Sequence, residues 1–203
     1  MLRVLGKASS INVRKVLWTC DEIGRPFASE ECATDTAEFR ALNPNGLVPV
    51  TVDGDFVLWE SNTIIRYLAN ARAATTLYPV DARARAQIDQ WIDWQATEFN
   101  ASWRYAFQAL VRKSAAHTDL AQIEASVQDW STAVAIVDEQ LSRTGGFIAG
   151  PVFTLADIPI GLSINRWFMT PIAPRPSFSA VAAYYERLSE RPGFIRHGRN
   201  GIP

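Results

Sequence analysis

Histidine and cysteine are scarce in this chain, which has only two residues of each. Cys20 and Cys32 form neither a Cys-x-x-Cys pair nor a disulfide framework, which fits a reducing compartment. His117 and His197 have no metal-ligating neighbour at a useful spacing, so we expect neither a structural zinc site nor histidine catalysis. Any chemistry should therefore use hydroxyls, amides, backbone dipoles or a cofactor.

Two further absences concern membranes and nucleic acids. No apolar run approaches the roughly 18 residues of a membrane span, and the first residues turn polar too soon for a signal peptide. The charges balance to a formal net charge of −1 without a long run of one sign, whereas nucleic-acid-binding proteins usually carry a basic stripe. We therefore expect a cytoplasmic protein that binds neither membranes nor nucleic acids.

Apolar residues, in contrast, are plentiful. They make up 48% of the 203 residues, enough for a real core in one large domain or two small ones.

The first half of the chain alternates short apolar runs with helical periodicity. Asp53-Gly54 between two alternating runs predicts a β-hairpin turn, and Ser61 after the second run is predicted as a helix N-cap. The expected order is βαβαββα, with a mixed sheet that has a parallel pair and an antiparallel hairpin. Strands are expected at about 1–6, 27–32, 50–52 and 56–59, and helices at about 13–24, 36–42 and 61–72.

The second half shows no convincing strand. We expect helices at about 81–112, 119–141 and 177–190, the last ended by Arg191-Pro192, with a very apolar stretch before it that reaches Met169. Residues 74–81 include Pro79 and show little helical or strand periodicity, which is typical of a linker. The prediction is an α/β domain at 1–73 and an all-α domain at 82–203.

Thr154 to Asp157 has the spacing of a capping box. The Thr154 hydroxyl is expected to cap the N–H of Asp157, and the Asp157 carboxylate to reach back to the N–H of Thr154. Phe153 and Ile158 stand where a hydrophobic staple would place them. We interpret this box as structural rather than catalytic.

Four short motifs, in this order, carry a family resemblance. They are Ser-Ser-Ile-Asn-Val-Arg-Lys-Val at 9–16, Asn43-Pro44 with Gly46 and Val48-Pro49, Glu60-Ser61, and Thr-Leu-Ala-Asp at 154–157. Over nearly its whole length the chain resembles cytosolic glutathione S-transferases, of the theta-like and bacterial serine- or asparagine-type groups. The resemblance implies a thioredoxin-like first domain that binds glutathione and a helical second domain that helps to bind an electrophile.

The resemblance also implies how glutathione is held. Pro49 would be cis, and the Val48 backbone would pair with the cysteinyl part of the peptide as an added strand does. Glu60 and Ser61 would hold the γ-glutamyl end, where a strand leads into a helix N-terminus suited to an anion. The residue before Val48 is often polar or basic in the family, but here it is Leu47. Arg14 or Arg104 is therefore expected to bind the glycyl carboxylate, unless glutathione binds weakly.

Activation of the thiol is expected in the first of these motifs. A free thiol has a pKa of ~8.5, and a hydroxyl or amide donor at the positive end of a helix favours its thiolate. Ser10 matches the serine of theta-like members and Asn12 the asparagine of some bacterial members. Both remain candidates, with Ser10 preferred. The loop contains neither tyrosine nor cysteine, which argues against a tyrosine-type or a mixed-disulfide mechanism.

The electrophile is expected to bind near Trp103, Arg104 and Phe107, late in the first long helix. The prediction is thus a homodimeric glutathione transferase that uses glutathione as co-substrate and needs neither metal nor nucleotide. Two alternatives stay open. One is another glutathione-dependent reaction on the same scaffold, such as disulfide or peroxide reduction, dehalogenation or isomerisation. The other is a non-catalytic binding protein.

Overall fold

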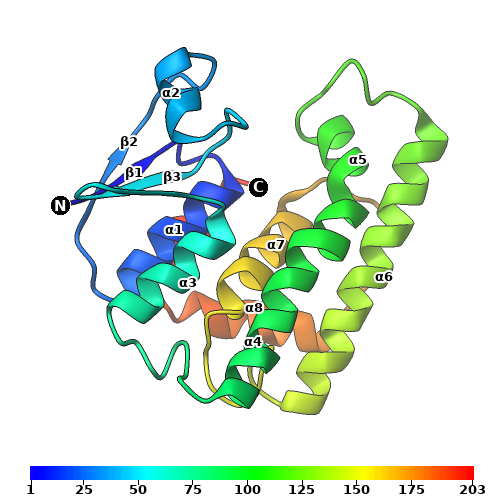
Figure 1. Ribbon diagram of the computed structural model, residues 1–203. Helices are drawn as coiled ribbons and strands as arrows, with labels where there is room; N and C mark the ends of the chain where they lie inside the picture. The colour runs from blue at the N-terminus through cyan, green and yellow to red at the C-terminus, as the bar shows by residue number, and fades with distance from the viewer.

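The computed structural model describes residues 1–203, a sheet-containing part followed by a helical part (Figure 1). The first part comprises β1 (Leu2–Leu5), α1 (Ile11–Glu22), β2 (Phe27–Glu30), α2 (Ala37–Leu42), β3 (Val50–Asp53), β4 (Phe56–Trp59) and α3 (Ser61–Ala71). The second comprises α4 (Ala82–Trp94), the π-helical η1 (Gln95–Phe99), α5 (Asn100–Leu110), α6 (Leu120–Thr144), α7 (Asp157–Met169), α8 (Ser179–Ser189) and α9 (Pro192–His197). The predicted βαβαββα order and the all-helical second part are confirmed.

A four-stranded mixed sheet with the order β2-β1-β3-β4 organises the first part. β1 pairs in parallel with β2, and β3 pairs antiparallel with both β1 and β4. The connections explain two of these pairings, because the α1 crossover brings β2 parallel to β1 and a tight turn brings β4 antiparallel to β3. α1 and α3 lie side by side beneath the sheet in Figure 1, and α1 also contacts α7 and α9.

The core is shared by both parts. One cluster of 38 buried apolar residues runs from the sheet into the helices. Trp18 on α1 lies at the junction, with its ring centroid 5.8 Å from that of Phe153 and 5.1 Å from that of Phe194. Because α1 packs on both sides, its first turn is held in a fixed position relative to the helical part.

The change of architecture falls between Ala71 and Ala82, where the sequence predicts a linker. Leu77 and Tyr78 in this segment are buried, and the Leu77 carbonyl accepts a 2.9 Å hydrogen bond from the N–H of Leu155. The segment is thus packed against the helical part. The division into domains at 1–73 and 82–203 stays a prediction.

The hairpin turn lies one residue later than the sequence predicts. Asp53 still pairs with Phe56, so the turn residues are Gly54 and Asp55, and only Gly54 has a positive φ, 68°. The Asp53 carboxylate accepts hydrogen bonds from Arg25, at 2.7 Å, and from Tyr67, at 3.2 Å. These two bonds hold Asp53 in the strand and shift the turn.

The last helical segment was predicted incompletely. α8 ends at Ser189 as expected, but Arg191-Pro192 begins a further short helix, α9. Proline at the first helical position has no hydrogen bond to lose, since the N–H groups of the first turn have no partner inside the helix. The long helix predicted for 81–112 is also interrupted, by the π-helical segment η1.

One arm of the capping box is confirmed and the other is wrong. The N–H of Thr154 donates to Asp157 Oδ2 at 2.8 Å, as expected. The N–H of Asp157, however, donates to the backbone carbonyl of Thr154, and the Thr154 hydroxyl donates to Asp157 Oδ2 at 3.1 Å. The Thr154 hydroxyl makes its hydrogen bond to the Asp157 carboxylate, so it does not cap the helix.

Candidate functional site

Three chain segments meet at one end of the sheet. Leu5 pairs with Val50, and Val50 pairs with Trp59, so these three residues lie at the same level across neighbouring strands. The loop after β1, the segment before β3 and the junction after β4 therefore leave the sheet at the same end. The fold brings together the three motifs that the sequence singled out in its first half.

Gly6 shows how tightly the first two segments pack. A methyl group added there would lie 2.7 Å from Cγ2 of Val13 and 2.7 Å from Cβ of Val48. Gly6 also has a φ of 137°, which L residues with a side chain rarely adopt. Only glycine lets the start of α1 and the Val48 segment approach this closely.

Ser10 and Asn12 lie in the first turn of α1. Ser10 is the N-cap residue, with φ −77° and ψ 125°, yet its hydroxyl makes no capping hydrogen bond. The side chains of Ser10 and Asn12 are both half-buried. Both groups are available to a ligand at the positive end of the helix, so the local geometry does not choose between them.

The Val48–Pro49 peptide bond is cis, as the family resemblance implies. Neither the N–H nor the C=O of Val48 takes part in a backbone hydrogen bond. The turn before it is held by Asn43, whose Nδ2 donates to the Leu47 carbonyl at 2.7 Å and whose Oδ1 accepts from the N–H of Asn45 at 3.1 Å. The segment therefore presents one unpaired backbone donor and one unpaired acceptor.

Glu60 and Ser61 form the junction between β4 and α3. Ser61 is the first residue of α3 rather than its N-cap, which is Glu60 with φ 69° and ψ 107°. A positive φ at a non-glycine residue costs on the order of 1–3 kcal/mol and is a feature of binding sites. Glu60 is exposed and forms no ion pair, whereas Ser61 is buried with its N–H at the helix N-terminus.

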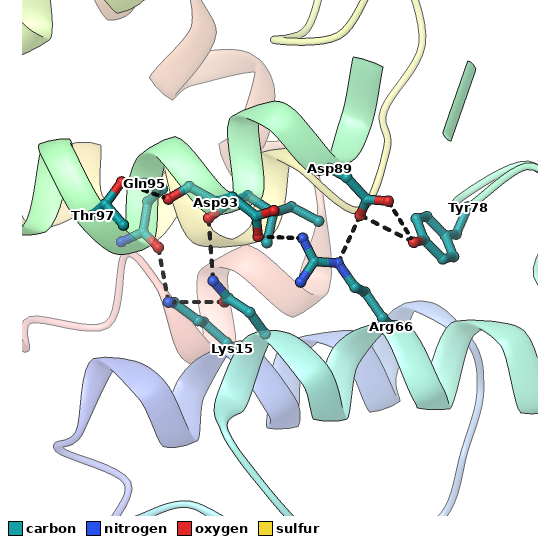
Figure 2. Close-up of polar contacts among 9 residues, drawn as sticks. Lys15, Arg66, Tyr78, Asp89, Asp93, Gln95 and Thr97 are labelled. Carbon is teal, nitrogen blue, oxygen red and sulfur yellow. Dashed lines mark hydrogen bonds and ion pairs between the residues drawn. The ribbon is translucent and has the colours of Figure 1, made fainter. Parts of the chain in front are cut away.

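A polar network anchors this junction to the helical part (Figure 2). Nζ of Lys15 donates to Asn62 Oδ1 at 3.1 Å and to Gln95 Oε1 at 2.8 Å. Gln95 is the first residue of η1, and its amide also donates to Ser163 at 2.9 Å. The pKa of Lys15 is lowered to about 7, chiefly by burial and also by the charge of Arg166, while Glu60 acts in the opposite direction.

Arg66 completes the attachment of α3. Its guanidinium forms ion pairs with Asp89 at 2.6 Å and with Asp93 at 2.5 Å, both on α4 (Figure 2). Tyr78 donates to the same Asp89 at 3.0 Å. Together these bonds hold the start of α3 against the bundle.

Leu47 is 65% exposed and provides no charge. The guanidinium of Arg40, on α2, lies beside the same turn: a methyl group added at Gly46 would be 3.0 Å from Arg40 Nη1. Sequence reasoning missed Arg40, although it lies on the short helix that directly precedes this turn. Arg14 bonds the backbone oxygens of Ile202 and Pro203, each at 2.8 Å.

The three residues expected near the electrophile separate into two groups. Trp103 and Phe107 are buried with their rings in edge contact, at a centroid distance of 5.6 Å, whereas Arg104 is exposed. The guanidinium of Arg166, on α7, lies over both rings, 4.4 Å from the centre of Trp103 and 3.9 Å from that of Phe107. The sequence analysis did not select Arg166, which only tertiary packing brings to α5.

The environment of Arg166 is energetically unusual. It is 3% exposed, and its Nε has no hydrogen-bond partner. Its pKa is lowered to about 9, chiefly by burial and also by the charges of Arg14 and Arg112. A cation over an aromatic ring gains about 0.5–2 kcal/mol, whereas burial of an ion costs several kcal/mol. The two rings therefore do not offset the cost of this buried charge.

No group of three or more His, Cys, Asp or Glu side chains is arranged to hold a metal ion. No helix combines the length and the apolar character needed to cross a membrane.

Comparison with known proteins decides the family. Residues 9–71 match the family model for the glutathione S-transferase N-terminal domain, and residues 102–192 match that for the C-terminal domain. Over 201 residues the chain is 34% identical to the glutathione S-transferase GstB of Escherichia coli K12, with 95% of each chain covered. The chain belongs to the glutathione S-transferase family.

Other members of this transferase family extend the comparison. The chain is 34% identical over 207 residues to glutathione S-transferase 3 of Zea mays, with 95% of this chain and 91% of the relative covered. A theta-class glutathione S-transferase from Xanthomonas axonopodis pv. citri, solved with glutathione bound, superposes with a TM-score of 0.90. It is 39% identical, with 97% of this chain and 96% of that chain covered. The family and fold implied by the sequence resemblance are both confirmed.

Proposed function

We propose that this transferase converts the thiol of glutathione to a thiolate and transfers it to a small, largely hydrophobic electrophile. The observation that carries the proposal is the convergence of free polar groups at one end of the sheet. These are the side chains of Ser10 and Asn12, the backbone of Val48, and the Glu60-Ser61 junction.

The unpaired Val48 backbone pairs with the cysteinyl residue of glutathione in the manner of an added strand. One N–H and one C=O are available, and each hydrogen bond contributes about 0.5–1.5 kcal/mol net. This contact fixes the register of the peptide and so the direction in which its sulfur points. Pro49 lies between Val48 and β3, and its ring restricts the backbone where the chain enters that strand.

The γ-glutamyl end binds at the start of α3. Its carboxylate accepts hydrogen bonds from the Ser61 hydroxyl and from N–H groups of the first turn, where the helix dipole favours an anion. The exposed Glu60 carboxylate, which forms no ion pair of its own, binds the ammonium group. The strained φ of Glu60 supports this role, since such strain is typical of ligand-binding positions.

Arg40 takes the role that Leu47 cannot perform. Its guanidinium lies beside Gly46, two residues before Val48, and binds the glycyl carboxylate. Arg40 is exposed and forms no ion pair, so it is free to accept this partner. An arginine suits the role because its planar fork matches a carboxylate.

The sulfur lies at the N-terminus of α1, where either Ser10 or Asn12 donates a hydrogen bond to it. A donor and a helix dipole both favour the thiolate over the thiol. Each pKa unit of lowering corresponds to about 1.36 kcal/mol. The protein thus contributes chiefly a pre-formed site for the thiolate, without a covalent enzyme intermediate.

The electrophile lies between the sulfur and the end of α5. Trp103 and Phe107 form the apolar floor of this region, and Arg104 stands at its exposed side. Homodimerisation and a cytoplasmic location are part of the same proposal. The exposed Phe56 supports the dimer as an apolar surface contact.

Calorimetry with glutathione followed by a conjugation assay with chlorodinitrobenzene tests the proposal. We expect saturable binding at millimolar glutathione or below, and release of chloride with formation of the thioether. Absence of binding at millimolar glutathione would overturn it and leave the non-catalytic alternative. Binding with turnover of a disulfide or peroxide, but no conjugation of any electrophile, would favour the reductase alternative. Light scattering at micromolar protein checks the dimer, which a monomeric mass would contradict.

A further inference from the structure

Arg166 is a buried cation for which the protein supplies no counter-ion. It forms no ion pair, its Nε lacks any partner, and its guanidinium carbon lies 4.4 Å from the centre of the Trp103 ring and 3.9 Å from that of Phe107. Buried charges in proteins are normally paired, because an unpaired ion in a low-dielectric site is costly. The unpaired charge of Arg166 therefore indicates that a negatively charged ligand binds to it.

Two further arginines surround it. The guanidinium carbon of Arg112, an exposed residue, lies 5.5 Å from the centre of the same Phe107 ring. Arg14 is fully buried on α1. The charges of Arg14 and Arg112 both act on Arg166. These three residues form what we call the arginine cluster.

The arginine cluster lies next to the proposed sulfur site. The N–H of Arg14 donates to the carbonyl of Ser10 at 3.0 Å, so Arg14 is one helical turn beyond Ser10. The start of α1 and the end of α5, which precedes Arg112, lie toward the same end of the molecule (Figure 1). The cluster thus lies toward the end of the molecule where Ser10 or Asn12 would hold the thiolate.

We propose that the arginine cluster binds a carboxylate on the electrophilic co-substrate, so that this transferase prefers anionic electrophiles. Arg166 and Arg112 donate hydrogen bonds to the carboxylate. Arg14 contributes its charge, because its Nη1 and Nη2 already donate to backbone oxygens of the chain end. The inference rests on the proposed glutathione transfer, which supplies the nucleophile.

The reaction balances without a further reagent. In a chlorodinitrobenzoate the thiolate sulfur attacks the carbon that carries chlorine, the C–S bond forms, and the C–Cl bond breaks with departure of chloride. The thiol proton goes to solvent when the thiolate forms. The carboxylate stays unchanged and serves only for binding and orientation.

A matched pair of electrophiles tests the preference. One is a chlorodinitrobenzoate with the carboxylate para to chlorine, and the other is its primary amide, which has nearly the same shape but no charge. We expect Arg166→Met to lower kcat/KM for the acid about 10- to 100-fold, as for loss of a charge-assisted hydrogen bond, with at most a few-fold change for the amide. Arg112→Gln should lower kcat/KM for the acid several-fold, and this variant should fold normally because Arg112 is exposed. Arg83→Gln, an exposed arginine on α4, is the control and should change neither value.

A binding measurement keeps this inference separate from the proposed function. Calorimetry with dinitrobenzoate, which lacks chlorine and cannot react, should give weaker binding to Arg166→Met and Arg112→Gln than to the natural protein. If neither electrophile is turned over but the variants bind dinitrobenzoate more weakly, the result contradicts the proposed glutathione transfer and supports the anion-binding site. If kcat/KM falls equally for the acid and the amide, and the pKa of bound glutathione rises, the inference is overturned. The cluster would then stabilise the thiolate rather than the electrophile. Equal dinitrobenzoate binding by all variants would overturn it as well.

Discussion

Nζ of Lys15 donates a 2.8 Å hydrogen bond to Oε1 of Gln95 and so joins the helix behind the proposed sulfur site to the π-helical turn of the bundle. Lys15 is 1% exposed and has no carboxylate in contact. A buried lysine that bonds only amide oxygens links the two parts of the fold without an ion pair.

Lys15 makes stability depend on pH. Its pKa is about 7 in the folded protein and 10.5 when unperturbed, so between these values the unfolded state binds the proton more strongly. The free energy of unfolding should therefore rise with pH across this window, while below about pH 7 the folded state carries the full cost of the buried charge. Urea unfolding at several pH values should show a smaller slope for Lys15→Met than for the natural protein. Identical slopes would mean that Lys15 is not the group responsible.

Gly6 should be essential to the site. Gly6→Ala places a methyl group 2.7 Å from both Val13 and Val48 at a φ of 137°. We expect a loss of about 1–3 kcal/mol in stability, as for overpacked positions, and at least ~10-fold weaker glutathione binding because the Val48 segment is displaced. Gly24→Ala is the matched control, since φ is +59° there but nothing lies within 4 Å. If both variants bind glutathione equally well, the close approach at Gly6 is unimportant for the ligand.

Two single substitutions decide whether Ser10 or Asn12 donates the hydrogen bond to the glutathione thiolate. We expect Ser10→Ala to lower conjugation ~10-fold or more, equivalent to ~1.4 kcal/mol of transition-state stabilisation, and to raise the apparent pKa of bound glutathione. Thiolate absorbance as a function of pH measures the second effect directly. Asn12→Ala is the comparison variant. Should Asn12→Ala produce both changes and Ser10→Ala neither, the two roles must be exchanged.

Arg40 should matter only for the glycyl end of glutathione. We expect Arg40→Gln to weaken binding of glutathione roughly 3- to 30-fold, the range of a lost charge-assisted contact that is partly exposed. Its effect should be much smaller with the glycyl ethyl ester of glutathione, which lacks that carboxylate. Arg40→Gln combined with Leu47→Lys should recover part of the affinity. An equal loss for glutathione and its ester would show that Arg40 acts through the structure of the turn.

The elements of the fold were predictable because they depend on local patterns. Alternation, helical periodicity, and the Gly and Pro positions gave the order of strands and helices in both parts. One error occurred where distant contacts override the local preference: Arg25 and Tyr67 hold Asp53 in its strand and move the hairpin turn by one residue. The other has a local origin. Pro192 suits the first position of a helix and begins one, whereas the sequence analysis took Arg191-Pro192 only as an end.

The sequence by itself determined the family, the βαβαββα order, and the segments that carry Ser10, Val48 and Glu60, since each of these is written in short contiguous motifs. Only the tertiary structure decided which residues from different segments meet. Sheet pairing brings the three segments to one end, α2 places Arg40 beside Gly46, and α7 lays Arg166 over Trp103 and Phe107. Such meetings follow from packing of a shared core, and no spacing along the chain encodes them. Our proposal that the electrophile carries a carboxylate depends on this packing of Arg166, which sequence reasoning could not see.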